Sequence, residues 1–379
     1  MATTFKTFLN DDITSTKTLL HEAIPLTGSI ASGTYNTAGA TTDTYNGTNI
    51  KNYAHGMYQS VYDYPYLSSS ANHIFDLSVG YSSDSPLSAS GYDGTTVQQA
   101  KKINMYNEMA QVLVGLDQTG AIRNFDEDGN IADGGVKLKE CFFVNFARLL
   151  SKDEIKKGSF TIKIGTGSYA SPFSDGDTST VITISDSGKE NDYRVNSPAG
   201  EYAILSATAN YGTGWTSAPA CGLIFYQAGI VVLSSSVFQS GSSIAHGGIG
   251  GGGAGIDNAP FRSNNTYVTA SLTGSQISAS CNYFRNRLDD ISFNNTTELN
   301  STIHFCRINH NDFNYSANPT YLSASQIRVK NSPLDSPISY MTTIGLYSSD
   351  NELLAVAKLS EPLKKDPTNE MTIRVRLDY

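Results

Sequence analysis

The C-terminal segment constrains the fold most, because its side chains alternate between apolar and polar. Every second residue from Met371 to Leu377 is apolar, and the residues between them are polar or charged. A period of two places one face of a β-strand on a core and the other in water. Upstream, the apolar stretches 338–347 and 352–360 flank the polar turn Ser348–Asn351, which predicts a β-hairpin. The last strand runs to the C-terminal residue, and since most termini fray, this favours a compact part that fits among other proteins.

Composition indicates a β-rich protein. Charged residues make up 16% of the chain, against about 25% in an average soluble domain. Their place is taken by Ser, Thr, Asn, 33 glycines and 22 tyrosines, which suit strands and turns better than long helices. The 379 residues allow two or three domains at roughly 150 residues each.

One segment is predicted to be an amphipathic helix that packs on a sheet. Thr96 and Gln99 match a capping box, in which each side chain bonds the other residue's free backbone N–H, and Gly115 supplies a stop. Apolar residues then recur at spacings of three and four: Val97, Ala100, Ile103, Tyr106, Ala110 and Leu113.

Strands are predicted at irregular spacing along the rest of the chain: residues 159–165, 181–184, 202–207, 222–233 and 302–308. Ser151 and Glu154 predict the start of a short helical turn that Gly158 ends. The predicted fold is therefore mainly β, with β-sandwich-like units, one amphipathic helix, short capped helical turns and long polar loops.

The sequence suggests four segments. Residues 1–95 form an N-terminal arm with a Tyr-rich segment, and residues 96–233 form an α+β domain with the one clear helix and several strands. Residues 234–300 are rich in Gly, Ser and Asn and are predicted to be a loop region, and residues 301–379 form an antiparallel β domain. The glycine-rich run 246–256 is not expected to hold a regular element, because each glycine has much backbone entropy to lose.

The charge balance argues against nucleic-acid binding. The formal net charge is -9 and the isoelectric point about 5.1, whereas binding a phosphate backbone needs clustered Lys and Arg. No window approaches the ~18 apolar residues of a membrane helix, and the N-terminus lacks the apolar core of a signal peptide. We therefore expect a soluble protein with no nucleic-acid and no membrane partner.

Three sets of residues resemble metal sites without completing one. His304, Cys306 and His310 could offer three ligands, since residues 304 and 306 share a strand face, but no fourth ligand accompanies them and a structural His–Cys pair is favoured. The runs Asp126–Asn130 and Asp175–Asp177 resemble calcium loops, yet they fit turns better. We predict no metal and no cofactor.

The sequence offers no constellation for catalysis. No Gly-x-Ser-x-Gly elbow surrounds a serine that follows a strand and opens a helix, and the Asp-rich segments lie in polar turns rather than in paired positions for sugar hydrolysis. The cysteines are spread singly, which predicts buried, reduced thiols: Cys141, Cys221, Cys281 and Cys306. We expect that the chain is not an enzyme.

Two clusters are candidate interfaces. Tyr62, Tyr64 and Tyr66 belong to a Tyr-rich run, and a Tyr ring buries area while its hydroxyl stays hydrogen-bonded. Arg374 and Arg376 lie on the outer face of the last predicted strand. Each cluster has a plainer interpretation, which is core or loop packing for the tyrosines and a solvated strand face for the arginines.

A lone Trp215 in a Gly-rich turn could stack on a sugar ring. The alternative is a Trp that packs on the edge of a sandwich, which is the more common role of such a residue. Sugar binding would make the chain a receptor-binding or carbohydrate-binding module.

Several stretches carry a resemblance to a known family. They are residues 19–28, 62–76, 293–300, 340–347, 351–370 and 374–379. Together they resemble virion structural proteins of contractile-tailed, myovirus-type phages of marine bacteria and cyanobacteria. The C-terminal pattern also resembles the closing sheet of baseplate wedge and tail-associated proteins.

This resemblance implies a role in virion assembly and brings no catalytic residues with it. The expected function is that of a multimeric baseplate or tail subunit, which assembles in the host cytoplasm into the virion and binds other tail proteins and copies of itself. The alternatives are a neck, collar or head decoration protein, or a receptor-binding or carbohydrate-binding tail module.

Overall fold

The chain folds into two compact units. The computed structural model describes residues 5–27, 30, 47–88, 96–130, 135–165, 181–209, 220–238, 276–316, 322–323, 326–327, 332 and 334–379. The terminal unit consists of residues 1–20 and 298–379, and the central unit of residues 21–297. This division differs from the four predicted segments, because the N-terminal strand pairs with a strand from residues 288–308 and joins the two ends of the chain in one unit.

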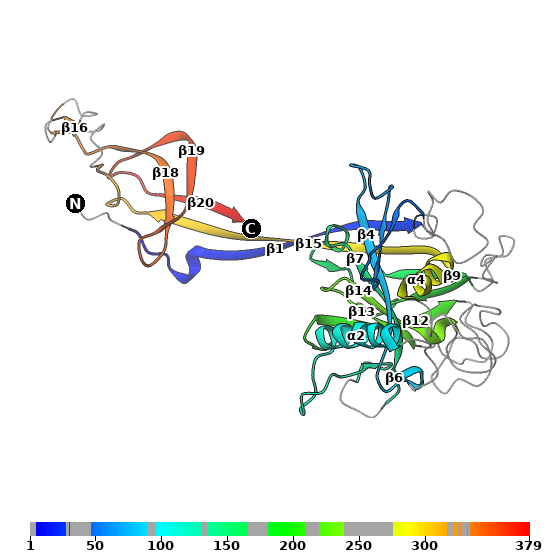
Figure 1. The fold of residues 1–379 in the computed structure, drawn as a ribbon. Helices are drawn as coiled ribbons and strands as arrows, with labels where there is room; N and C mark the ends of the chain where they lie inside the picture. The colour runs from blue at the N-terminus through cyan, green and yellow to red at the C-terminus, as the bar shows by residue number, and fades with distance from the viewer. Residues whose placement is uncertain are drawn as a thin grey trace. The chain divides into compact units, whose positions relative to one another are not determined.

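The described residues are mainly β (Figure 1), as predicted. The strands are β1 (Ile13–Thr27), β2 (Ile50–Asn52), β3 (Gln59–Tyr62), β4 (His73–Tyr81), β5 (Phe125–Asp126), β6 (Lys137–Leu138), β7 (Glu140–Phe146), β8 (Glu154–Ile155), β9 (Thr161–Gly165), β10 (Val181–Ser185), β11 (Arg194–Ser197), β12 (Gly200–Ala209), β13 (Ala220–Phe225), β14 (Ile230–Ser234), β15 (Leu288–Ile308), β16 (Leu322–Ser323), β17 (Gln326–Ile327), β18 (Ser339–Tyr347), β19 (Leu353–Lys365) and β20 (Met371–Asp378). The helices are α2 (Thr96–Leu113), α3 (Arg148–Ser151) and α4 (Ile277–Asn286), with 3-10 turns at Asn10–Asp12, Pro86–Ser88 and Ser235–Phe238. None of these helices is long and apolar enough to span a membrane.

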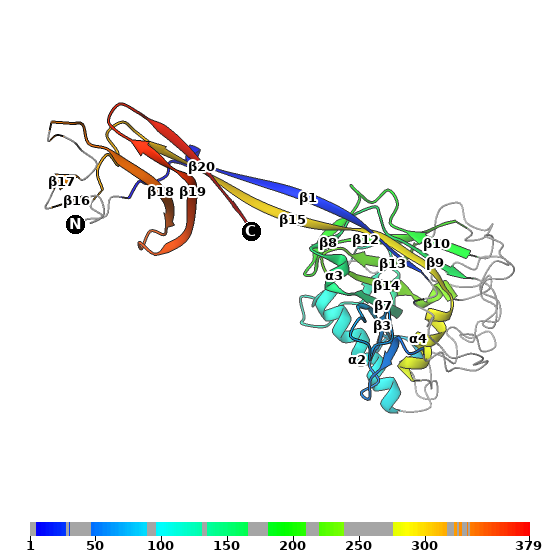
Figure 2. The same cartoon turned by 90° about the horizontal axis from the view of Figure 1, so that it is seen from above.

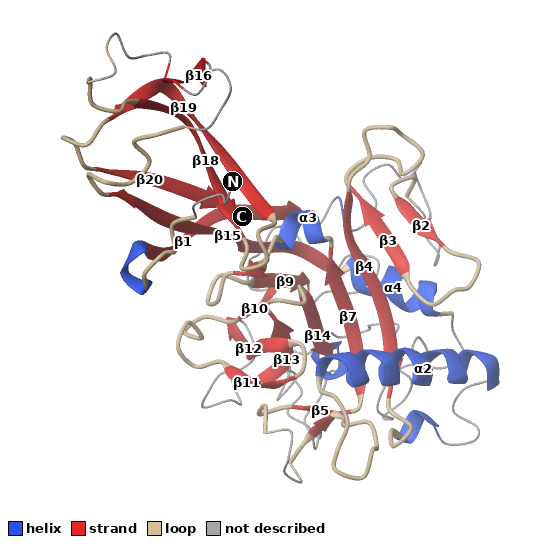
Figure 3. Cartoon of the chain, turned by 90° about the vertical axis from the view of Figure 1, so that its left-hand side faces the viewer, coloured by secondary structure: helices blue, strands red, loops and turns tan. Residues whose placement is uncertain are grey.

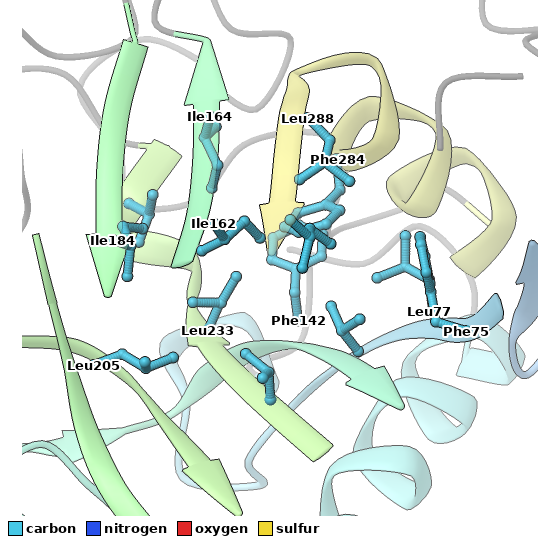
Figure 4. Packing of buried hydrophobic residues seen from close by; sticks show 14 of the residues in the cluster. Phe75, Leu77, Phe142, Ile162, Ile164, Ile184, Leu205, Leu233, Phe284 and Leu288 are labelled. Carbon is cyan, nitrogen blue, oxygen red and sulfur yellow. The ribbon is translucent and has the colours of Figure 1, made fainter. Parts of the chain in front are cut away.

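One large sheet, most of whose strands belong to the central unit, organises the fold. Its strand order is β1-β15-β9-β10-β12-β13-β14-β7-β4-β3-β2, with β8, β11 and β20 attached at its sides. The sheet folds over on itself, so that Ile162 of β9 and Leu288 of β15 share one core with Phe142 of β7 and Leu233 of β14 (Figure 4). Two layers of one sheet enclosing a core give the unit the β-sandwich-like character that the sequence predicts.

Helix α2 covers the opposite face of the central sheet (Figure 3). Tyr106 packs edge-on against Phe125, with ring centroids 5.4 Å apart. The helix lies close to β4 because Gly80 has no side chain: a Cβ there would lie 2.5 Å from the Lys102 carbonyl oxygen. The predicted helix and its packing on a sheet are therefore confirmed, although Val97 in its first turn is 63% exposed.

Two local predictions in the central unit are wrong. The predicted loop region 234–300 contains α4 and a large part of β15. Ile277, Cys281 and Phe284 lie one helical turn apart and are buried, so tertiary packing overrides the weak helix propensity of the Ser and Asn around them. The predicted helical turn at Ser151–Gly158 is instead the end of α3 followed by β8, which pairs with β15 at Asn295.

Most strand predictions agree with the structure. Strands β9, β10 and β12 occupy the predicted segments, and 302–308 is the end of β15. The segment 222–233 is a hairpin rather than one strand, because Gly229 takes a φ of 66° in the turn between β13 and β14.

The terminal unit contains the C-terminal strands. β18 and β19 pair with each other as a two-stranded antiparallel sheet (Figure 2). The third predicted strand, β20, pairs along its whole length with β15, from Met371 opposite Ile308 to Asp378 opposite Ser301. Exposed and half-buried residues alternate along β20, which confirms the predicted period of two.

Candidate functional site

The terminal unit buries little apolar surface. Among its described residues, the buried hydrophobic side chains are Ile303 and Ile308, both on β15. Both hydrophobic clusters of the described chain lie in the central unit. A small unit that buries a small fraction of its surface has little stability of its own.

The same unit carries most of the exposed large hydrophobic side chains of the described chain. They are Phe5, Leu9, Ile13, Leu19, Leu20, Leu299, Phe313, Tyr315, Leu334, Tyr340, Tyr347, Leu353, Leu354, Val356, Leu363 and Tyr379. Single exposed apolar residues are normal, but an accumulation of them on one unit is the mark of an interaction surface.

The β18–β19 hairpin is the clearest example of exposed large apolar side chains in this unit. Its turn is fixed by the Ser348 hydroxyl, which accepts hydrogen bonds from the backbone N–H groups of Asp350 and Glu352, both at 3.2 Å. Beyond the turn, Leu354 is 63% and Val356 54% exposed, whereas the half-buried positions between and after them are Ala355 and Ala357. On residues 354–357 of β19 the larger apolar side chains therefore lie on the exposed face and the two alanines on the half-buried face.

Strand β1 adds an exposed edge to the terminal unit. All residues from Ile13 to Leu20 are exposed, and β1 stands at the end of the sheet order, paired with β15 on one side. Within the described chain no strand pairs with its other side. The Lys17 ammonium pairs with Glu298 at 2.5 Å. A long unpaired edge presents backbone donors and acceptors to another chain.

A groove of about 570 Å³ lies inside the terminal unit, between residues 5–12, the end of β15 and β18. Phe5 packs edge-on against Tyr347, with centroids 4.9 Å apart. The charged residues that line the groove form ion pairs within the chain: Lys6 pairs with Asp312 at 2.5 Å, and Arg307 pairs with Asp12 at 2.6 Å. The groove therefore favours an apolar, uncharged occupant.

The two predicted interface arginines are exposed on β20. The Arg376 guanidinium donates to Asp378 Oδ1 at 2.6 Å and to the Ser301 hydroxyl at 2.9 Å. The Ser301 hydroxyl in turn donates to Asp378 Oδ1 at 2.6 Å. This bond, followed by that from Arg376, holds the pKa of the Asp378 carboxyl below its usual value. Arg376 thus already has an acidic neighbour in its own chain, and Arg374 lies on the same exposed face.

The three predicted interface tyrosines lie on β3 and the loop after it. Tyr62 is half-buried, and Tyr64 and Tyr66 are 50% and 37% exposed. The Tyr62 ring lies 6.2 Å from that of Tyr66 and 5.5 Å from that of His73. Tyr62 and Tyr66 are thus brought together.

A second group of aromatic rings lies beside these tyrosines, on the loop between β2 and β3. The rings of Tyr53, His55 and Tyr58 contact one another with centroids 4.9 to 5.1 Å apart. His55 and Tyr58 border a pocket of about 560 Å³ in the central unit. The pocket lies over β4 and β7 and is flanked by α2, with these further lining residues: Met57, Asp76, Ser78, Met105, Glu108, Met109, Phe143 and Asn145.

Next to this pocket, Ser60, Asp76 and His73 have the residue types of a catalytic triad in a different order. The Ser60 hydroxyl donates to Asp76 Oδ1, and the His73 Nε2 lies 2.9 Å from the same oxygen. In a triad the imidazole lies between the hydroxyl and the carboxylate and takes the proton from the hydroxyl. Here the carboxylate lies between them, so this arrangement does not activate Ser60.

The His304, Cys306 and His310 side chains do not form a three-ligand group in the structure. His304 is 9% exposed and lies 5.3 Å from the Phe8 ring, while His310 Nδ1 lies 3.1 Å from Glu370 Oε1. Among the described residues no group of three or more His, Cys, Asp or Glu side chains could hold a metal ion.

The Asp126–Asn130 run is a turn, as predicted. Asp126 Oδ1 accepts from the backbone N–H groups of Asp128 and Asn130, and Gly129 takes a φ of 76°. The predictions for Asp175–Asp177, the glycine run 246–256 and Trp215 lie outside the described residues.

The four cysteines are free thiols, and Cys141, Cys221 and Cys281 are buried, as predicted, while Cys306 is half-buried. Burial raises the pKa of Cys141 well above its usual value and that of Cys281 to about 12. These thiols stay protonated and unreactive at neutral pH.

Sequence patterns did not reveal the pocket of the central unit. Its lining comes from a loop, two strands and a helix, and Asp76, Glu108 and Asn145 are separate in the sequence. The one signal present was the Tyr-rich run that contains Tyr58.

Comparisons with known proteins give no further guide. No protein-family model, no curated protein sequence and no solved structure matches this chain.

Proposed function

We propose that this chain is a structural subunit of a contractile-tailed phage virion, placed in the baseplate or tail. There it assembles with other tail proteins and with copies of itself. The observation that carries the proposal is the terminal unit, which buries Ile303 and Ile308 but exposes Leu354, Val356 and Tyr347. The resemblance of the C-terminal stretches to virion proteins supports the choice of particle.

The physical argument starts from the cost of exposed apolar area. Covering apolar surface contributes about 25 cal/mol per Å², and a stable protein interface covers roughly 800 Å² on each partner. The outward side chains of β19 and the exposed edge of β1 offer area of the right kind for such a partner. An added strand would also pair the backbone groups that β1 leaves open.

The test is the location of the protein in purified particles. Mass spectrometry of intact virions of the phage that encodes the chain should find it, and separated tails should retain it. Its absence from intact particles would refute the proposal.

A pair of variants then tests the surface. Leu354→Lys combined with Val356→Lys places two charges on the outward face of β19, and we expect loss of the protein from particles. The matched control is Val112→Lys, because Val112 is 62% exposed on α2 in the central unit; particles should incorporate it normally. Normal incorporation of the double variant would show that this face is not an interface.

A further inference from the structure

The pocket of the central unit has the dimensions of a small-ligand site. Its volume of about 560 Å³ lies within the roughly 300–1,000 Å³ of typical ligand pockets. The loop that forms one wall is held in place: the His55 carbonyl accepts from Lys101 at 2.9 Å, and the Met57 carbonyl accepts from the Ser78 hydroxyl at 2.6 Å. Gly56 supports this loop with a φ of 64°.

His55 and Tyr58 form an aromatic wall of the pocket, and Tyr53, which is not among the lining residues, contacts both rings. Tyr53 and His55 are stacked, with an interplanar angle of 13°, and Tyr58 contacts both rings. The Met57 N–H donates to His55 Nδ1 at 3.1 Å, so the neutral ring carries its proton on Nε2. Burial, with smaller effects of Tyr53 and Asp76, raises the pKa of the Tyr58 phenol. Its hydroxyl is therefore a donor at neutral pH.

The floor combines apolar and polar groups. Met57, Met105, Met109 and Phe143 supply apolar contacts, and methionines adapt to irregular shapes. Asp76, Glu108 and Asn145 bring carboxylate and amide oxygens to the same space. Asp76 is held in position because its Oδ1 accepts a hydrogen bond from the Ser60 hydroxyl and is hydrogen-bonded to His73 Nε2.

We propose that this pocket binds a pyranose ring of a glycan. A sugar ring has an apolar C–H face that can lie against Tyr58 and the methionines, and hydroxyl groups that can donate to Asp76, Glu108 and Asn145. The charge of the surroundings is mixed, since the Lys101 ammonium is held at the carbonyl of the lining residue His55 and the lining also carries two carboxylates, which favours a neutral ligand over a cation. This site is separate from the terminal unit and does not depend on the assembly role.

The test is saturation-transfer NMR on the full chain with a panel of glucose, galactose, mannose and N-acetylglucosamine at millimolar concentration, with tetramethylammonium as the competing ligand class. We expect transfer to at least one sugar and none to tetramethylammonium. Tyr58→Ala and Glu108→Gln should each weaken binding of that sugar at least tenfold, and Tyr64→Ala, outside the pocket, should not change it.

Glu108 is exposed on α2, so Glu108→Gln keeps the test valid if Tyr58→Ala does not fold. No transfer to any of the four sugars, transfer to tetramethylammonium alone, or binding that survives both pocket variants would overturn the proposal. Because the isolated protein is used, each of these outcomes is independent of the particle-incorporation test.

Discussion

The two units use the same kind of alternating strand in opposite ways. In the central unit, neighbouring residues on β7 point to the two faces of the sheet, and both Phe142 and Phe143 are buried. In the terminal unit, the alternation on β19 places Leu354 and Val356 in solvent and Ala355 and Ala357 toward the interior. A period of two therefore predicts a strand, but the size of the side chains on each face indicates whether the chain covers that face itself.

The difference follows from how many layers each unit supplies. The central sheet folds over its own core and is covered by α2 on the other face. In the terminal unit β18 and β19 form a two-stranded sheet, which is marginal by itself. Residues of this sheet share a small pocket with β15 and β20, whereas Leu354 and Val356 are exposed. In the proposed assembly a neighbouring subunit supplies a layer over that exposed face.

The largest expected effect is in the central core. Phe142 stacks on Phe284 with centroids 5.2 Å apart and is fully buried. Phe142→Ala should lower the free energy of unfolding by about 3–5 kcal/mol, measured by urea denaturation. The exposed control Val112→Ala should change it by less than about 0.5 kcal/mol. A small effect of Phe142→Ala would mean that the central unit is not the stable part of the molecule.

The cost in stability of a Gly→Ala substitution can be compared between the two units. At Gly80 a Cβ would meet the backbone of α2, 2.5 Å from an oxygen, so Gly80→Ala should cost about 1–3 kcal/mol through overpacking. At Gly345 the nearest obstacle is the ring of Tyr347 at 2.8 Å, which is 43% exposed and can move. Gly345→Ala should cost well under ~1 kcal/mol, since strand Gly→Ala is otherwise favourable. Equal losses in the two variants would contradict a loosely packed terminal unit.

One aspartate in each unit makes the stability of the protein depend on pH, and the two dependences have opposite signs. Burial raises the pKa of Asp186 in the central unit, although it accepts from Gly158, Phe160 and Tyr226 at 2.7 to 2.8 Å. The folded state then binds this proton more tightly than the unfolded state. Stability from this group is full below the unfolded pKa of 3.8 and is lost as pH rises through the folded pKa.

The lowered pKa of Asp378 in the terminal unit acts in the opposite direction. Its contribution is present above pH 3.8 and is lost as pH falls through the folded pKa. Both predictions are checked by urea denaturation at a series of pH values from 3 to 6. In the parent protein Asp186 lowers the free energy of unfolding as pH rises, and Asp186→Asn should abolish this decrease. Asp378 raises the free energy of unfolding by a smaller amount as pH rises, and Asp378→Asn should abolish that increase. If the free energy of unfolding of Asp186→Asn varied with pH as in the parent protein, the opposite contributions of the two aspartates would be contradicted.

The smallest effect is expected on the outer face of β20. Reversing the charges with Arg374→Glu and Arg376→Glu should change stability by less than about 0.5 kcal/mol, because exposed ion pairs contribute little. Since Arg376 already bonds Asp378, we expect normal particle incorporation. Loss of incorporation, measured by mass spectrometry of particles, would instead indicate an acidic partner at this face.

The parts of the fold that sequence could predict depend on local patterns. The alternation of β20, the polar turn at Ser348–Asn351 and the three-four spacing of α2 each lie within one short segment. Helix α4 was missed because its buried residues, such as Cys281 and Phe284, stand among Ser and Asn, which favour turns. The folding-over of the sheet depends on pairing β15 with β9, which no local pattern records.

The candidate surfaces were predictable to a smaller degree. The exposed face of β20 follows from alternation, which placed Arg374 and Arg376 correctly on its outer side. The outward position of Leu354 and Val356 was not predictable, because apolar residues in a strand are expected to face a core. The pocket at Tyr58 needed long-range contacts among β4, β7 and α2.

The most direct test of the central claim is hydroxyl-radical footprinting with mass spectrometry, on the isolated protein and on the protein in purified particles. The claim is that a neighbouring subunit covers the outward face of the terminal unit. We predict that labelling of Leu354, Val356 and Tyr347 falls strongly in particles while labelling of Val97 and Val112 on α2 stays the same. Equal labelling of Leu354 and Val356 in the two states would contradict it.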